Sequence, residues 1–508
     1  MAGAYKTPGV YIVEKNAFPN SVVEVATAVP AFIGYTQVAE LKGSPLHKKP
    51  WRITSLAEFK NAFGGAPLDQ FEFAENTDAN TPNDFKSGAT GYVLKRKNSK
   101  LDTQRYYLYR SLQLFFQNGG GPCYIVSVGG YAAEPDIKKS DLLEGIDLLL
   151  KEQEPTMVVI PDAMALSADE AIAVQQATLL HCGAQMKNRF AVLDIHDGFR
   201  ERDTADPVAA FRSDLGTTAL NYGAAYYPWL NTSIVETADV GFDSFVDRTK
   251  LKDLLVAELT AAGTLSDDLK DILNQVGDVN RDASQKTYLS DDELHKILFS
   301  VVPTYANILL AMKRKLNLLP PAAAMAGVYT LVDNARGVWK APANVSLASV
   351  ISPAVNITHQ QQEDLNVTTA GKSVNAIRSF IGEGTLVWGA RTLDGNSLDW
   401  RYINVRRTMI MIEESLRLAT KAYVFEPNVS GTWVTIKGMA NNFLTSVWKR
   451  GGLAGASPED AFSVSVGLNE TMTPEDILEG ILRVTILVAV SRPAEFIEIT
   501  FQQQMQKS

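Results

Sequence analysis

The sequence predicts a multidomain protein that combines α/β and α+β regions, with extended β arms at both termini. Helix and strand patterns alternate through the first half of the chain, which is typical of a parallel sheet. The chain has 508 residues, 46% hydrophobic and 21% charged, enough for about three folded domains. Short β-prone stretches occur near both ends of the chain, and these predict the arms.

The N-terminal stretch, residues 1–30, is expected to be an arm that pairs with another subunit. A breaker at 7–9 precedes a β-prone run. The residues of this run that we expect to form the inter-subunit strand are Val10, Tyr11, Ile12 and Val13. A second short extended piece follows at 22–25. Residues 30–35 then have the composition of a buried strand that enters the first globular region.

The middle of the chain, residues 31–40 and 102–355, is expected to form an α/β domain. A helix predicted at 106–116 ends at the Asn-Gly-Gly-Gly-Pro stop of 118–122. Helices are also predicted at 141–151 and 168–182, and strands at 123–128, 157–160, 190–195 and 222–230. Two polar stretches interrupt this pattern, and we expect a surface insertion at 41–101 and a second outer insertion at 239–293.

The C-terminal region, residues 356–508, is expected to form a separate domain. A strand is predicted at 386–390, helices at 402–423 and 473–482, and a strand at 484–490. The breaker Arg492-Pro493 opens a C-terminal arm, 493–508, which contains a final strand at 496–501. The residues expected to form this second inter-subunit strand are Phe496, Ile497, Glu498, Ile499 and Phe501, in which apolar and polar side chains alternate from Ile497 onward.

Composition excludes several classes of protein. The formal net charge of -9 argues against a general binder of nucleic acid backbones, which normally carries a basic face. Two cysteines, Cys123 and Cys182, are too few for a disulfide framework and indicate folding in a reducing cytoplasm. No secretory signal core is visible at the N-terminus. The apolar stretch 477–490 is too short and too charged to span a bilayer.

Candidate enzyme motifs are weak. Ala370 to Ser373 resembles the end of a phosphate-binding loop, but Asn366 stands where the first glycine is needed. The run that begins at Asp278 resembles half of a calcium loop, but Ala283 replaces its glycine. The cluster Asp194, His196 and Asp197 can serve a metal or a general base, or can be ordinary turn chemistry. We therefore predict no catalytic, cofactor or metal site, and keep this cluster as the enzymatic alternative.

Arg406 and Arg407 lie inside the helix predicted at 402–423. Two interpretations are open for them. They can meet acidic partners, or they can lie on a solvated helix face where they brace Glu413 and Glu414.

A series of short segments is spread in order over nearly the whole chain: 8–14, 29–34, 115–120, 222–229, 320–344, 375–378, 387–392, 402–407, 425–428 and 492–497. Together they resemble the contractile tail sheath family of phages, contractile bacteriocins and extracellular injection systems. The poorly matching regions are the two expected insertions.

This resemblance implies a core domain that is built from both chain ends and faces an inner tube. It also implies that the two arms join strands of neighbouring subunits. Such a chain is a structural sheath subunit, not an enzyme. It polymerises helically around the tube in a metastable extended state and contracts to drive the tube through a target envelope. The candidate tube contact is the acidic start of the helix predicted at 473–482, formed by Glu475, Asp476 and Glu479.

The implied partners are neighbouring sheath subunits, an inner tube protein, and baseplate and terminator or cap proteins. Direct nucleic acid binding and membrane insertion are not expected. The expected location is the bacterial cytoplasm during assembly, and afterwards a phage virion or a released extracellular particle. The alternatives that stay open are a hydrolase or metal-dependent enzyme, a tube or baseplate protein, and a component of a type VI secretion sheath.

Overall fold

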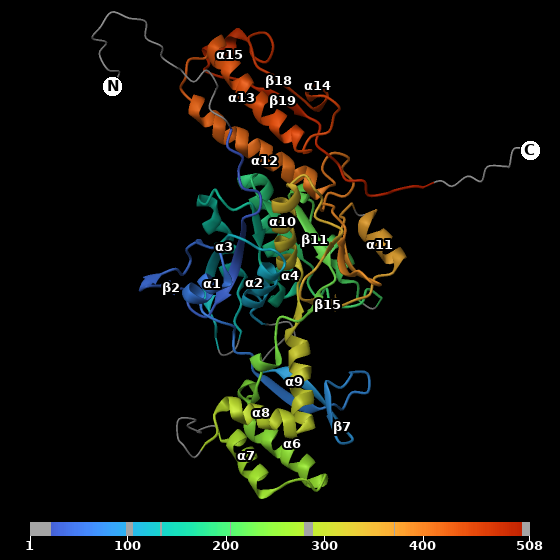
Figure 1. Cartoon of the computed structure of the whole chain (residues 1–508). Coiled ribbons are helices and arrows are strands. Elements are labelled where there is room, and N and C mark those ends of the chain that lie inside the picture. The colour runs from blue at the N-terminus through green and yellow to red at the C-terminus, as the bar shows by residue number, and fades with distance from the viewer. Residues whose placement is uncertain are drawn as a thin grey trace, which may run out of the picture. The chain divides into compact units, whose positions relative to one another are not determined.

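The computed structural model describes residues 22–97, 105–132, 135–203, 205–278, 288–369 and 371–499. The chain divides into two compact units (Figure 1). The larger unit comprises residues 26–407. The smaller unit combines the N-terminal end with residues from 408 onward, so its described part is 22–25 and 408–499. The smaller unit is therefore built from both ends of the chain, as expected.

A nine-stranded sheet forms the centre of the larger unit, in the order β14-β17-β16-β11-β10-β9-β1-β8-β4. These strands are β1 (Pro30–Thr36), β4 (Trp51–Ile53), β8 (Cys123–Gly130), β9 (Met157–Val159), β10 (Phe190–Asp194), β11 (Gly223–Tyr227), β14 (Val345–Ser346), β16 (Asn375–Phe380) and β17 (Gly384–Trp388). The neighbours from β8 through β16 run parallel, and the outer pairs run antiparallel. The predicted parallel sheet is therefore present.

Helices bury this sheet. All seven residues of β1 are buried, as is typical of a strand with both faces covered. The covering helices include α2 (Leu108–Gln117), α3 (Lys139–Leu148), α4 (Ala168–Leu180) and α10 (Ala322–Arg336). Helix α2 packs against α10, and α3 packs against α4. Gly327 permits the first of these contacts, since a Cβ atom there would lie 2.6 Å from the carbonyl oxygen of Phe115.

Two buried aspartates fasten helix starts to the sheet. Asp162 accepts the backbone N–H groups of Tyr107 and Leu108 at the start of α2, at 2.6 and 3.0 Å. Asp194, at the end of β10, accepts the N–H of Ala322 at the start of α10. Burial raises the pKa of the carboxyl group to about 6 for Asp162 and to about 7 for Asp194, against the hydrogen bonds that lower it.

The two expected insertions meet in one outer lobe, defined here as residues 71–96 and the described part of 235–316 (Figure 1). It contains β5 (Phe71–Glu75), β6 (Phe85–Ser87), β7 (Thr90–Arg96), α6 (Arg248–Ala261), α7 (Asp267–Gly277), α8 (Asp291–Val301) and α9 (Pro303–Leu316). Its own hydrophobic core joins Phe71 and Phe73 to Leu251, Leu273 and Tyr305. The lobe is thus a single packed body made from separated stretches of sequence.

The first expected insertion, 41–101, begins too early. β4 is a strand of the main sheet, and α1 (Leu56–Phe63) buries Phe59 and Phe63 in the main core. The second expected insertion, 239–293, ends too early, because α9 belongs to the outer lobe as well.

The remaining elements of the larger unit are short: β2 (Glu40–Leu41), β3 (Ser44–Pro45), α5 (Pro207–Asp214), β12 (Leu230–Thr232), β13 (Leu318–Leu319), β15 (Val350–Pro353) and α11 (His359–Asn366). The expected boundary at 356 also differs from the structure. β16 and β17 follow that position yet complete the large sheet, so the division falls at 407/408, inside α12 (Ile403–Thr420).

The smaller unit contains the end of α12 and α13 (Ser430–Lys449), α14 (Pro458–Ala461), β18 (Phe462–Ser465), α15 (Pro474–Leu478) and β19 (Thr485–Val488). Helix α13 buries Ile436, Met439, Phe443, Leu444 and Val447. β18 and β19 form an antiparallel pair with no third strand among the described residues. The helix predicted at 473–482 is shorter, because it ends before Gly480, whose φ is +74°.

Candidate assembly site

The enzymatic alternative does not form a convergent site. Asp194 is directed to the start of α10, where it accepts the Ala322 N–H at 2.7 Å. The His196 ring contacts the carbonyl oxygen of Leu166 through Nε2, at 2.9 Å. Asp197 pairs with Arg200 at 3.0 Å, and its nearest approach to the His196 ring is 3.8 Å. Each side chain therefore serves its own local contact, and nothing supports catalysis by the three together.

The phosphate-loop resemblance also has a structural explanation. The Lys372 ammonium donates to the carbonyl oxygen of Arg212, and Ser373 Oγ donates to the carbonyl oxygen of Asn366 at 2.7 Å. The first contact ties Lys372 to a segment 160 residues earlier, and the second closes a local turn, so both groups serve the protein's own structure. The calcium-loop resemblance extends through 279–287, outside the described residues. Within the ranges that the structure describes, no group of three or more His, Cys, Asp or Glu residues is placed to hold a metal ion.

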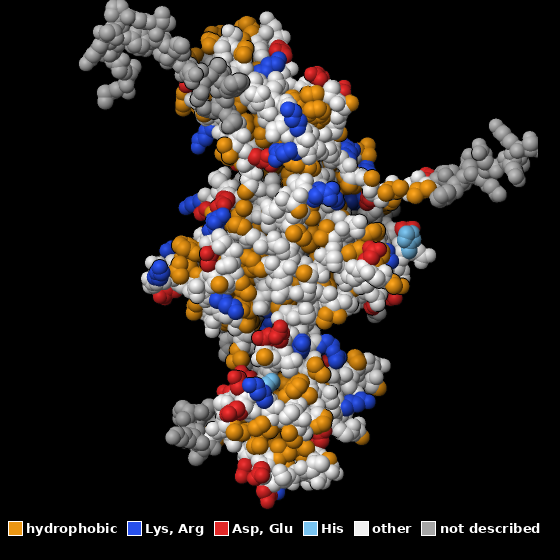
Figure 2. Space-filling view, in the orientation of Figure 1, with side chains coloured by type: hydrophobic (Ala, Val, Ile, Leu, Met, Phe, Trp, Pro, Cys, Tyr) orange, Lys and Arg blue, Asp and Glu red, His pale blue; other side chains and the backbone are white. Residues whose placement is uncertain are grey.

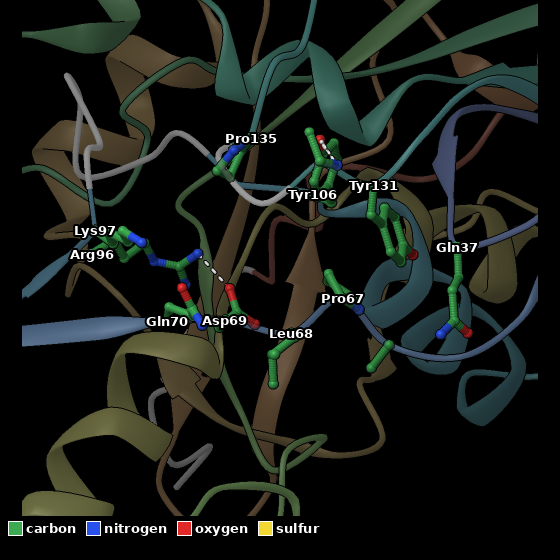
Figure 3. Close-up of a pocket in the computed structure, with 12 residues that line it drawn as sticks. Gln37, Pro67, Leu68, Asp69, Gln70, Arg96, Lys97, Tyr106, Tyr131 and Pro135 are labelled. Carbon is green, nitrogen blue, oxygen red and sulfur yellow. Dashed lines mark hydrogen bonds and ion pairs between the residues drawn. The ribbon is translucent and has the colours of Figure 1, made fainter. Parts of the chain in front are cut away.

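A cavity of about 340 Å³ lies where the chain enters the outer lobe (Figure 3). Asp69 and Arg96 point toward each other on one side, while Tyr106 and Tyr131 lie on another. Asp69 contacts the guanidinium groups of both Arg96 and Arg110 at 2.6 Å. Burial opposes ionisation of Asp69, but these cations lower the pKa of its carboxyl group to about 2. Asp69 is thus paired with both arginines, and these two ion pairs fasten the start of the lobe.

Within the residues that the structure describes, the C-terminal tail 491–499 forms no strand and pairs with none. Its apolar side chains are nevertheless exposed: Phe496 by 75%, Ile497 by 79% and Ile499 by 70%. Figure 2 shows the hydrophobic atoms along this tail. Glu498 is exposed as well, and Phe501 lies outside the described residues. The strand expected at 496–501 is therefore not formed in its described part, 496–499, and its pairing with a neighbouring subunit stays a prediction.

The two-stranded sheet of the smaller unit, β18 and β19, has open edges to which a further strand can be added. Strand pairs without further support are marginally stable, and the outer edges of such a pair present unpaired N–H and C=O groups. Leu487, on β19, is 65% exposed. A groove of about 1050 Å³ adjoins the strand, lined by the apolar side chains of Leu416, Ile436, Ala440, Leu482, Val484 and Ile486 among others. The unit thus offers both a tail with exposed apolar side chains and a two-stranded sheet to which a further strand can be added.

Helix α15 carries the residues expected to contact a tube. Thr473 and Asp476 form a capping box at its start. Asp476 also pairs with Arg483 at 2.9 Å, and this hydrogen-bonded pair holds the pKa of the Asp476 carboxyl below its usual range. Glu475 and Glu479 are exposed. Asp476 therefore has a local structural role, while Glu475 and Glu479 remain candidates for contact with another protein.

The root of the N-terminal arm is held by a buried ion pair. Arg407, in α12, contacts Asp333, in α10, at 2.6 Å. Thr27 Oγ1 donates to the same carboxylate at 2.6 Å, and the carbonyl oxygen of Thr27 accepts from Arg407 at 2.9 Å. In the smaller unit, the N–H of Val25 donates to Ser415 Oγ at 3.1 Å. Val10, Tyr11, Ile12 and Val13 lie outside the described residues.

The surface position considered for Arg406 and Arg407 is wrong, since both are only 4% exposed. Arg406 lies over the rings of Trp400 and Tyr222, at 4.2 and 4.6 Å from their centroids. Glu414, which they were expected to brace, pairs instead with Arg417. The sequence analysis missed the role of Thr27 and Asp333. Thr27 lies in none of the segments that carry the resemblance. Asp333 lies in one of them, 320–344, but its partner Arg407 is 74 residues away in sequence.

Membrane-spanning character is weak in the part of the chain that the structure describes. No single helix there has the length and apolar character needed to cross a bilayer, and only the bent pair α8 and α9 passes when the two helices are counted together.

The phage tail sheath C-terminal domain matches residues 396–504. The tail sheath protein of Vibrio phage KVP40 is 23% identical over 187 residues, which are 36% of this chain. That alignment spans 26% of the relative's own length.

Solved structures match far more of the chain. A chain of the anti-feeding prophage baseplate is 28% identical, with a TM-score of 0.59, and the match covers 99% of this chain and 100% of that one. A chain of an extracellular contractile injection system, the PVC sheath complex in its contracted state, is 26% identical with a TM-score of 0.58, and 99% of each chain is covered. The chain thus carries a match to the phage tail sheath C-terminal domain at residues 396–504, and over nearly its whole length it is similar to chains of contractile sheath and baseplate assemblies.

Proposed function

We propose that the chain is the structural subunit of a contractile sheath. In this proposal, copies polymerise helically around an inner tube in a metastable extended state and then contract to drive the tube through a target envelope. The observation that carries the proposal is the likeness over 99% of both chains to a sheath complex in its contracted state.

The exposed tail supplies a physical means of assembly. Burying apolar side chains such as Ile497 and Ile499 lowers the free energy of the assembly by about 25 cal/mol per Å² of apolar surface removed from water. Adding the tail of one copy to the edge of β18 or β19 in another would bury these groups and satisfy both backbones. The N-terminal run Val10 to Val13 is proposed to join a neighbouring subunit in the same way. Identical head-to-tail contacts that do not close produce a helix of subunits.

Strand exchange also fits a machine that changes its pitch. If linked arms act as hinges, the compact units can rotate as rigid bodies while each copy stays attached to its neighbours. The N-terminal arm expected at 1–30 ends sooner, because Thr27 is fixed to the larger unit and Pro30 begins β1. The proposed arms are therefore the residues before Thr27 and 493–508, and the proposed tube contact is formed by the exposed Glu475 on α15 and the exposed Glu479 directly after it. Contacts made by exposed charges are individually weak and can therefore be broken on contraction.

Neighbouring copies, an inner tube protein, and baseplate and terminator or cap proteins are the proposed partners. The likeness to a chain of a baseplate assembly supports the baseplate partner. We place assembly in the bacterial cytoplasm and the finished particle in a phage tail or an extracellular injection system. The likenesses to a phage tail sheath protein and to an extracellular system support these two settings.

Negative-stain electron microscopy of the purified chain tests the proposal. The chain is expressed alone, with its tube protein, and with any second sheath chain encoded beside it. Long hollow striated cylinders from this chain, with or without the tube, are expected. Only monomers or small closed rings, even with the tube protein present, would overturn the proposal. Cylinders that need a second sheath chain would show the two-chain organisation of a type VI sheath instead.

A further inference from the structure

Three segments that are distant in sequence meet at the carboxylate of Asp333. Its Oδ2 atom accepts from Thr27 Oγ1 at 2.6 Å and from one terminal nitrogen of Arg407 at 2.6 Å. Its Oδ1 atom accepts from the other terminal nitrogen of Arg407 at 3.0 Å. The first of these nitrogens also donates to the carbonyl oxygen of Thr27, at 2.9 Å. Thr27 is therefore bound through both its side chain and its backbone.

The ion pair behind Thr27 is firmly embedded. The side chains of Arg407 and Asp333 are 3% and 2% exposed, so both charges depend on each other and on their hydrogen bonds. The guanidinium group of Arg407 lies 4.7 Å from the ring centroid of Tyr329, and the Tyr329 hydroxyl is 2.6 Å from that of Tyr226 in β11. The pair is thus connected to α10, α12 and the central sheet.

Thr156 holds the same segment from another side. Its Oγ1 atom donates to the carbonyl oxygen of Thr27 at 2.8 Å and accepts the N–H of Val29 at 2.9 Å. Ala26, one residue before Thr27, is exposed and is the first residue of the larger unit. Thr27 is therefore the point at which the N-terminal arm becomes fixed to this unit.

We infer that Asp333 and Arg407 are positioning residues that anchor the N-terminal arm, so that a pull along the arm passes into α10 and α12. Without them, Thr156 and the first hydrogen bonds of β1 would be the remaining attachments of Thr27 and Val29 to the larger unit. The anchoring itself is a property of the single chain, whereas the pull rests on the function proposed above.

Anchoring is measured on the unassembled full-length chain with a spin label at Ala26→Cys. The native Cys123 and Cys182 are completely buried, so labelling is selective. Asp333→Asn is expected to increase label mobility and to speed exchange of the Val29 amide by on the order of tenfold, the effect of losing one charge-assisted hydrogen bond. Thr27→Val removes only the hydroxyl and is expected to act in the same direction, but less.

The matched control is Asp69→Asn. Asp69 is also a buried carboxylate between guanidinium groups, but it fastens the outer lobe and does not contact the arm. Both Asp→Asn variants are expected to lower the unfolding midpoint, and only Asp333→Asn is expected to loosen Ala26. The proposed anchoring role would be refuted by an unchanged label spectrum in Asp333→Asn and Thr27→Val. It would also be refuted if Asp69→Asn increased the mobility of the label at position 26 as much as Asp333→Asn does.

The pull is tested in assembled cylinders. Asp333→Asn cylinders are expected to fragment when contraction is triggered, with loss of full-length contracted particles, while Asp69→Asn cylinders contract intact. Intact contraction of Asp333→Asn cylinders would refute the role under pull. If the parent chain forms no cylinders at all, the proposed function fails. The spin-label experiment on the unassembled chain still tests whether Asp333 and Arg407 anchor the N-terminal arm.

Discussion

Asp194 and Ala322 join the end of a central strand to the start of a buried helix, through an N–H···O hydrogen bond of 2.7 Å. Asp194 is 4% exposed, and burial raises the pKa of its carboxyl group to about 7 although the hydrogen bond from Ala322 lowers it. A side chain that first looked like a catalytic candidate thus fastens β10 to α10.

Asp194→Asn is expected to change how stability depends on pH. The folded pKa lies above the unfolded value of 3.8, so the folded state binds the proton more tightly. The stability from this group is complete below about pH 4 and is lost as pH rises through about 7, with a slope of up to about 1.4 kcal/mol per pH unit. Asparagine cannot ionise, so the variant should gain stability relative to the parent between pH 5 and pH 7.5. Urea unfolding at the two pH values measures this, and an unchanged difference would contradict it.

Gly327→Ala is expected to destabilise the larger unit by about 1–3 kcal/mol, because a methyl group would press α10 against the Phe115 carbonyl oxygen of α2. Gly438→Ala in α13 is the control, since nothing lies within 4 Å of the added atom. That change should stabilise by about 0.5–1 kcal/mol through helix propensity. Denaturant unfolding compares the two, and equal effects would argue against the close helix packing.

Substituting both Ile497 and Ile499 by Asp is expected to abolish cylinder formation, since the tail could no longer bury its apolar side chains in a neighbour. The stability of the unassembled chain should change by less than about 0.5 kcal/mol, because both side chains are exposed. Glu498→Gln, between them, should leave assembly intact. Electron microscopy and thermal unfolding give the two readouts. Normal cylinders from the double variant would remove the tail from the assembly mechanism.

Glu475→Lys and Glu479→Lys are expected to weaken binding of the chain to its tube protein. Each exposed charge contributes about 1 kcal/mol or less, and the loss should be largest at low ionic strength. Glu459→Lys is the matched control, because it changes an exposed acid in the first turn of another helix of the same unit. Co-sedimentation across a salt series distinguishes them. If all three variants behave alike, α15 is not the tube contact.

The predictable parts of the fold are those with a clear period. The parallel strands and helices α2, α3 and α4 follow the alternation seen in the sequence, because each pairs an apolar face with a turn signal. Helix α10 was not predicted: it is apolar nearly all round, and ten of its residues from Ala322 to Val332 are buried, so no amphipathic period marks it. Helix α13 was also not predicted.

The candidate site was predictable only where the chain is exposed. The alternation of apolar and polar side chains after Pro493 predicted a strand, and the resemblance implied its pairing with a neighbouring subunit, which stays a prediction. The structure leaves Ile497 and Ile499 exposed. The anchor at Asp333 could not be predicted in this way. It depends on the approach of three segments separated by up to 380 residues, which only the folded sheet brings together.

The shared core of the outer lobe has a consequence for how this protein can vary among its relatives. Phe71 and Phe73 pack in the same core as Leu251 and Leu273, although about a third of the chain separates them. Loss of either stretch alone would strip the apolar cover from the other. Natural variants should therefore gain, lose or exchange the two stretches together, so a related sequence that lacks one stretch should also lack the other.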